Sequence, residues 1–136
     1  ITAPSSIMGI DVYGTYSEGI CGFSLPTKAL TTSILPDIRP SAGSDWTGIS
    51  ITNPNNQSVS VKVELVRSDG NVATSKTVSV GALCKYKAVL TDFFDSAPLY
   101  ETDYLRVSAN PGVLAVEVSG SHNNSWMTSI CACSAY

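Results

Sequence analysis

The chain of 136 residues, with a mass of 14.3 kDa, has the length of a single domain. Hydrophobic residues make up 43% of it and charged residues only 14%, and eight basic against eleven acidic residues give a net charge of -3. This balance argues against nucleic-acid binding, which needs clustered cations, and no apolar run approaches the roughly 20 residues that span a membrane. One histidine, His122, leaves little material for histidine-dependent catalysis or metal ligation. The composition therefore predicts no enzyme, no cofactor and no metal site.

Short runs of alternating apolar and polar residues, separated by turn residues, follow one another along the chain. Strands are predicted, in order, at residues 7–25 (a hairpin), 46–51, 59–65, 72–80, 86–90, 104–109, 113–120 and 126–133. Residues 91–95 are typical of a helical turn, and the strands at 104–109 and 113–120 are expected to pair with each other around Asn110-Pro111-Gly112. We therefore expect an all-β fold, an antiparallel Ig-like β-sandwich of about nine strands with at most one short helical turn.

The apolar faces of these strands are expected to form the core. Its predicted members are Trp46, Ile49, Ile51, Val61, Val63, Leu105, Val107, Val116 and Val118. Asp11 and Glu117 alternate with apolar neighbours, so we expect both to face outward. Glu101 and Asp103 lie in a polar connecting segment, where carboxylates are ordinarily solvated, and we therefore do not expect them to be catalytic.

Four cysteines, Cys21, Cys84, Cys131 and Cys133, are an even number in a small and sparsely charged chain. This favours two disulfides in an oxidising compartment, and a chain that starts at Ile1 is expected when a leader has been removed. Cys131 and Cys133 are two residues apart and share one face of a strand, so we expect them to pair with Cys21 and Cys84 and not with each other. Which cysteine joins which is left open, and buried free thiols are the alternative.

Residues 7–15 echo residues 113–121 at an offset of 106. Eight of the nine aligned positions are identical or chemically close, and each segment leads into a polar turn and a second apolar strand. One explanation is that the two segments are simply similar amphipathic hairpins. The other, more specific explanation is a structural repeat of about 106 residues. The repeat divides the chain into residues 1–29, with a hairpin at 7–25 that resembles the end of a preceding module, and residues 30–136, a β-sandwich module.

Several short motifs occur in an order that resembles a known family. They are Trp46-Thr47-Gly48-Ile49, Asn53-Pro54, Asp69-Gly70-Asn71, Phe93-Phe94, Tyr104-Leu105-Arg106-Val107 and Leu114-Ala115, preceded by a run at residues 30–38. On these motifs, residues 30–133 resemble a β-sandwich module found, often in tandem, in secreted and surface proteins of bacteria. The resemblance implies an architecture and an extracellular location but no particular biochemical activity. The four cysteines depart from the usual module.

A hairpin such as residues 7–25 buries too little apolar surface to be stable alone, so it must pack on this domain or on a neighbour. Strand addition to a neighbour joins subunits head to tail, in a contact that does not close and grows into a fibre. We therefore interpret the chain as a secreted, non-enzymatic structural or assembly module of a bacterial surface or filament protein. Its expected partners are other copies of itself or tandem modules.

Carbohydrate binding is the alternative function. Sandwich modules bind sugars through exposed aromatic side chains, and the candidates for a surface-glycan site here are Trp126, Tyr13, Tyr16 and Tyr100.

Overall fold

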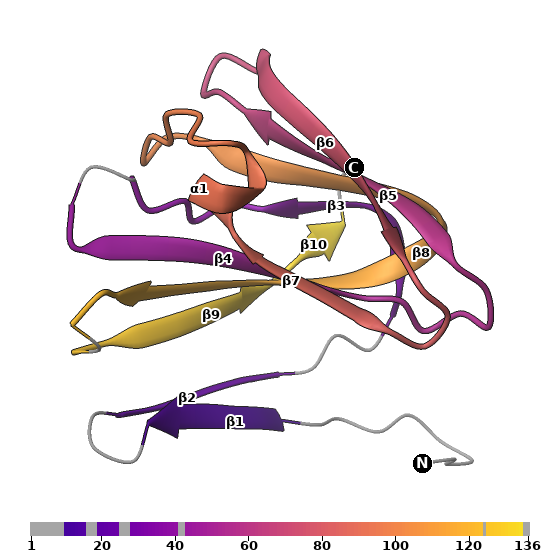
Figure 1. The fold of residues 1–136 in the computed structure, drawn as a ribbon, viewed down its shortest axis with the longest axis horizontal. Helices are drawn as coiled ribbons and strands as arrows, with labels where there is room; N and C mark the ends of the chain where they lie inside the picture. Colours follow the sequence, from indigo (N-terminus) through magenta and orange to yellow (C-terminus); the bar gives the residue numbers. More distant parts are fainter. Residues whose placement is uncertain (1–9, 16–18, 25–27, 41–42, 124, 135–136) are drawn as a thin grey trace.

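The computed structural model describes residues 10–15, 19–24, 28–40, 43–123 and 125–134 (Figure 1). Within these ranges the chain forms ten strands and one short helix, and every strand pairing is antiparallel. The elements are β1 (Ile10–Thr15), β2 (Gly19–Ser24), β3 (Leu30–Leu35), β4 (Asp45–Thr52), β5 (Val59–Val66), β6 (Val72–Val80), β7 (Lys85–Val89), α1 (Leu90–Phe93), β8 (Tyr104–Ser121), β9 (Met127–Cys131) and β10 (Cys133–Ser134). The predicted all-β antiparallel fold with one helical turn is confirmed. No helix among these residues is long and apolar enough to cross a membrane.

The long strand β8 connects two layers of strands. Residues 104–113 of β8 pair with β3 and β5 in layer A, which has the order β10-β3-β8-β5-β6. Residues 114–121 of β8 pair with β4 and β9 in layer B, which has the order β9-β8-β4-β7. Figure 1 shows the two layers facing each other, with β8 running through both. The fold is thus two layers held together by one shared strand.

The predicted pairing of residues 104–109 with residues 113–120 is wrong. Both segments belong to one strand, and the chain passes between the layers at a cis Asn110-Pro111 bond followed by Gly112. Gly112 lies against the start of β3, where an added Cβ would be 2.8 Å from the carbonyl carbon of Leu30 and 2.9 Å from its oxygen. The crossing point therefore requires a residue without a side chain.

The core lies between the layers and consists mainly of aliphatic residues. Six of the predicted members are buried in it: Ile49, Ile51, Val61, Val63, Leu105 and Val107. Each such side chain contributes about 1.5–3 kcal/mol through its burial. The helix α1 adds Leu90 and Phe93, and the ring of Phe93 meets those of Phe94 and Tyr86 edge to face, at centroid distances of 4.8 and 6.0 Å.

The other three predicted members, Trp46, Val116 and Val118, do not join this core. Trp46 and Val118 are half-buried, and Val116 is buried outside the core cluster. The reason is the alternation along β4 and β8: Ile49 and Ala115 point inward, so the even-numbered residues point to the outer face of layer B. A pattern of alternation defines two faces of a strand but not which of them is inside.

The strands β1 and β2 form a separate two-stranded sheet, and β2 lies next to β9 (Figure 1). The C-terminal part of β8 forms the corresponding antiparallel hairpin with β9. Both halves of the 106-residue echo therefore fold as hairpins of the same kind. The division of the chain into residues 1–29 and 30–136 stays a prediction.

Replacing Gly112 with alanine is expected to destabilise the fold, because the new methyl group must displace the backbone of Leu30. We expect the free energy of unfolding to fall by about 1–3 kcal/mol. Gly43→Ala is the matched control, since an added Cβ at Gly43 meets nothing within 4 Å. Urea unfolding followed by circular dichroism measures both variants. Equal midpoints for Gly112→Ala and the wild type would contradict the requirement at the crossing point.

Candidate functional site

The outer face of layer B carries a tryptophan packed against two glycines. Trp46, in β4, is half-buried, and Gly48 and Gly120 lie against its indole ring. An added Cβ at Gly120 would be 3.0 Å from ring atom Cζ2, and one at Gly48 would be 3.4 Å from ring atom Cζ3. The two glycines therefore leave room for the indole to pack closely against the sheet.

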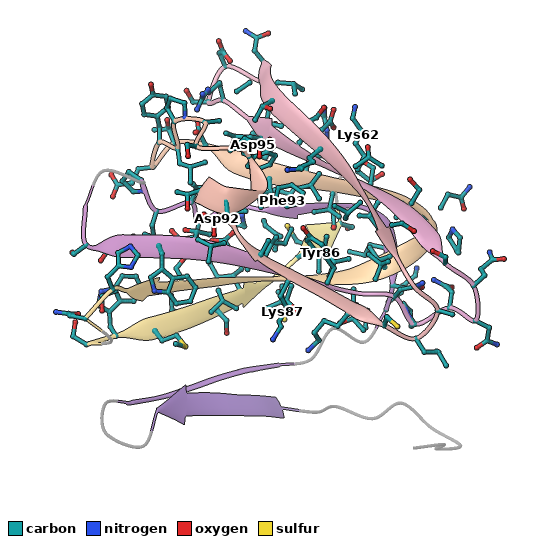
Figure 2. All side chains as sticks on the ribbon, in the orientation of Figure 1. Lys62, Tyr86, Lys87, Asp92, Phe93 and Asp95 are labelled. Atoms are coloured by element: carbon teal, nitrogen blue, oxygen red, sulfur yellow. The ribbon has the colours of Figure 1, made fainter. Side chains whose placement is uncertain are left out.

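A shallow hollow of about 390 Å³ lies beside this ring. Its lining comes from β4, β7 and β8 and includes Trp46, Gly48, Ser50, Lys87, Val89 and Val118. Lys87 is exposed and points away from the two layers, opposite to Tyr86, which packs against the core (Figure 2). The hollow is thus mostly apolar and open to solvent, with one cation at its border.

The strand β7 forms one wall of the hollow and is an edge strand. Among the described strands it pairs only with β4. At the end of this ladder the Asn53 N–H donates to the Cys84 carbonyl over 2.9 Å. The backbone groups of an antiparallel strand alternate between its two sides, so those of Tyr86 and Ala88 also point to β4.

The other side of β7 is open. By the same alternation, the N–H and C=O groups of Lys85, Lys87 and Val89 point away from β4. Such a row of unpaired backbone groups is a template on which a further strand can be added. The free edge of β7 and the hollow thus lie next to each other, with Lys87 and Val89 belonging to both.

Glu117, which was expected to face outward, lies inside the molecule. Only 1% of its surface is exposed, and its Oε2 accepts a hydrogen bond of 3.3 Å from the Asp37 N–H. Burial raises the pKa of Glu117 to about 8; the charge of Asp37 adds to this rise, while the Asp37 N–H bond and the charge of Arg39 oppose it. The carboxyl group is therefore mainly protonated at pH 7.

Polar side chains near Glu117 connect the segment after β3 to layer B. The Arg39 N–H donates to Thr47 Oγ1 over 2.8 Å, and the hydroxyl groups of Thr47 and Ser119 are 3.1 Å apart. The guanidinium of Arg39 pairs with Asp37 at 2.8 Å and lies 5.5 Å from the centre of the Trp126 ring. Trp126, one of the predicted sugar-binding residues, is half-buried and is engaged by this arginine.

Tyr100 is a candidate aromatic residue with a well exposed side chain, at 54%. The guanidinium of Arg67 lies 4.7 Å from the centre of its ring. Asp103 accepts hydrogen bonds from Arg67 and from the Tyr100 N–H, and it is buried, whereas the sequence predicted a solvated carboxylate. In the described contacts Tyr100 and Trp126 face different arginines and do not form one platform.

Cys84 and Cys133 are exposed free thiols. Cys131, in β9, and Cys84, before β7, lie at opposite edges of layer B, with β8 and β4 between them. Three strand spacings amount to about 14 Å, whereas a disulfide needs Cα atoms within about 7 Å. Of the pairings left open, the one between Cys84 and Cys131 in one chain therefore does not fit the strand order. Burial raises the pKa of the Cys131 thiol.

Three further predicted residues belong to the hairpin region. Tyr16 and the side chains of Tyr13 and Cys21 lie outside the residues that the structure describes. The strand β2, which carries Cys21, runs next to β9, which carries Cys131. A disulfide role for Cys21 stays a prediction.

His122 is exposed in the turn between β8 and β9, where its backbone N–H donates to the Ser44 carbonyl over 2.6 Å. In the described ranges no three histidine, cysteine or acidic side chains gather in a way that could hold a metal ion.

The sequence pattern did not predict this surface, because the alternation around Trp46 placed its side chain in the core. A signal was present in Gly48 and Gly120, two strand glycines, which often mark a close approach. Their relation to Trp46 follows only from the strand register, in which Trp46 lies opposite Gly120 and Gly48 lies opposite Val118.

No protein-family model matches the chain, and no curated protein matches it. A solved structure with a similar fold is the crystal structure of Thermotoga maritima 1070, with a TM-score of 0.66 and 10% sequence identity. The match covers 79% of this chain and 96% of that chain. At this identity the similarity concerns the fold alone.

Glu117→Gln is expected to remove a pH dependence of stability. The pKa of about 8 in the folded protein lies above the ordinary value of 4.5, so between these pH values the folded protein keeps a proton that the unfolded chain releases. The contribution of this group is therefore complete below pH 4.5, falls as the pH rises toward 8, and levels off above it. The slope is at most about 1.4 kcal/mol per pH unit.

Glutamine does not ionise, so the variant should have a flatter profile than the wild type and should exceed its stability at pH 8. Urea unfolding at several pH values between 5 and about 8.5 measures this difference. Glu101→Gln, at an exposed position, is the control and should keep the wild-type slope. Parallel profiles for Glu117→Gln and the wild type would show that the buried carboxyl does not titrate as stated.

Proposed function

We propose that this chain is a non-enzymatic, extracellular structural module of the Ig-like β-sandwich type, which joins copies of itself by β-strand addition at a bacterial surface or in a filament. The two antiparallel layers around one core support the sandwich class. The order of motifs from Trp46 to Leu114, which resembles modules of secreted bacterial proteins, supports the location.

The observation that carries the proposal is the hairpin of β1 and β2. Among the described strands β1 and β2 pair only with each other, and a two-stranded hairpin is marginal in water without further packing. It repeats the hairpin of β8 and β9, which in this domain is a full member of layer B. A chain that carries such a hairpin at one end and an open strand edge elsewhere has both halves of an assembly contact.

Light scattering coupled to size-exclusion chromatography tests the proposal on the full chain. From about 1 µM to about 1 mM protein, the mass is expected to rise from 14.3 kDa through its multiples without a fixed end point. The rise should persist in reductant, because backbone hydrogen bonds and not disulfides join the copies. A mass of 14.3 kDa at every concentration, with and without reductant, would overturn the assembly function.

A carbohydrate-binding or adhesive module is the second candidate, and the exposed ring of Tyr100 favours it. Its position over Arg67 combines an apolar face with nearby polar groups. On a glycan array, this function predicts a signal that falls about tenfold in Tyr100→Ala and is kept in Tyr100→Phe. An array without a signal for the wild-type chain would exclude the candidate for the sugars displayed.

A further inference from the structure

We propose that the open edge of β7, together with the hollow beside Trp46, is the acceptor for the hairpin of β1 and β2 from a second copy of this chain. The inference rests on the proposed assembly function and names the two surfaces that meet. Strand addition uses backbone hydrogen bonds for affinity and pockets for alternate side chains for specificity. Both features occur together on β7.

The backbone half of the acceptor is the open side of β7. The N–H and C=O groups of Lys85, Lys87 and Val89 point there, while those of Tyr86 and Ala88 complete the ladder with β4. A strand that pairs along these three residues leaves every existing hydrogen bond of layer B in place. The acceptor is therefore ready without any rearrangement of the fold.

The side-chain half of the acceptor is the hollow of about 390 Å³. Lys87 and Val89 belong to both halves, because their side chains line the hollow and their backbone groups face the open edge. An added strand therefore borders the hollow at Lys87 and Val89, two strand spacings (about 9.5 Å) from β4, which carries Trp46. Its apolar residues can contact Val89 and the aliphatic part of Lys87 at the border of the hollow.

The hairpin suits this acceptor by its composition and by its own open edge. Among the described strands β1 pairs only with β2, so the other side of β1 has no strand paired to it there. Residues 10–24 include Ile10 and Val12, carry two acidic residues, Asp11 and Glu18, and contain no basic residue. Lysines on an edge strand discourage indiscriminate pairing, and an acidic donor strand relieves that repulsion. Lys85 and Lys87 are exposed, and within the described ranges neither forms an ion pair.

The positions of donor and acceptor explain why the partner is a second copy. The hairpin of β1 and β2 lies next to β9, at one edge of layer B, and β7 is the opposite edge. A chain cannot place its hairpin at both edges at once, so the β7 edge receives the hairpin of another copy. Such a contact joins unlike surfaces, does not close, and extends as a chain of subunits.

The strand β6, also an open edge, fits the hairpin less well. The hollow that β6 borders is lined by polar residues, Ser60, Lys62, Thr77 and Ser108 among them. Lys76, in the middle of β6, is already paired with Asp95 at 3.3 Å. An apolar and acidic donor therefore matches the edge of β7 and not that of β6.

Lys87→Pro is the direct test, because proline removes the N–H that faces the open edge and leaves the ladder with β4 intact. In sedimentation velocity on the full chain, self-association is expected to weaken by about tenfold or more. Lys87→Thr is the matched control, since it removes the same side chain but keeps the N–H group, and its association should weaken only a few-fold. Urea unfolding of both variants verifies that the fold is kept.

A second pair of measurements does not depend on the proline. Hydrogen exchange is expected to slow at the amides of Lys85, Lys87 and Val89 as protein concentration rises, with no such change at Thr77 in β6. The double variant Lys85→Glu, Lys87→Glu should weaken association about tenfold at low salt. A chain that assembles with an unprotected β7, or equally well in Lys87→Pro and Lys87→Thr, would refute this acceptor and leave the assembly function standing. A chain that never assembles would refute both.

Discussion

The structure depends on the passage of β8 from one layer to the other. In layers A and B every strand pairs with β8 itself or with a strand that does, so the two layers are parts of one hydrogen-bonded network. Along β8 the odd-numbered residues from Leu105 to Ser121 are buried, except Pro111 at the crossing. The alternation therefore continues through the bend without a change of phase. A single strand thus decides which side chains face the core in both layers.

This continuity explains which parts of the fold the sequence could predict. Alternation and turn residues were sufficient for most of the strands, for the helical turn that contains Phe93 and for six of the nine predicted core residues, but they did not identify β3 as a strand. They were not sufficient for β8, because two separate strands around Pro111 allowed both Leu105 and Val116 to face inward. One continuous strand does not allow this, since the two residues are an odd number apart. The consequence is the burial of Glu117, whose polarity suggested the surface.

The candidate site was missed for the same reason. Once Glu117 and Ser119 face inward, Val118 and Trp46 must face outward, and the outer side of layer B becomes apolar. A residue pattern along β4 cannot report this, because the faces of β4 are set by its pairing with β8, whose residues lie far along the chain from Trp46. The similarity to Thermotoga maritima 1070, at 10% identity, concerns the fold alone and not the side chains on its surface. The outer surface of layer B depends on which residues of its strands face outward. It therefore cannot be inferred for one such protein from the fold of the other.

An ordinary antiparallel sheet has one apolar, buried face and one polar face exposed to water, and layer B differs from this pattern. Its inner side contains the buried polar groups of Glu117, Thr47 and Ser119. Hydrogen bonds, and the proton that the Glu117 carboxyl group retains, offset the cost of burying these groups. Its outer side carries apolar residues that remain partly exposed to water. Sheets that are apolar on the outside are usually covered by further structure. The hairpin beside β9 lies at one edge of this layer, and the hollow and the open edge of β7 lie toward the other. The phase of β8 thus links the buried carboxyl group inside the domain to the apolar hollow on its outer face.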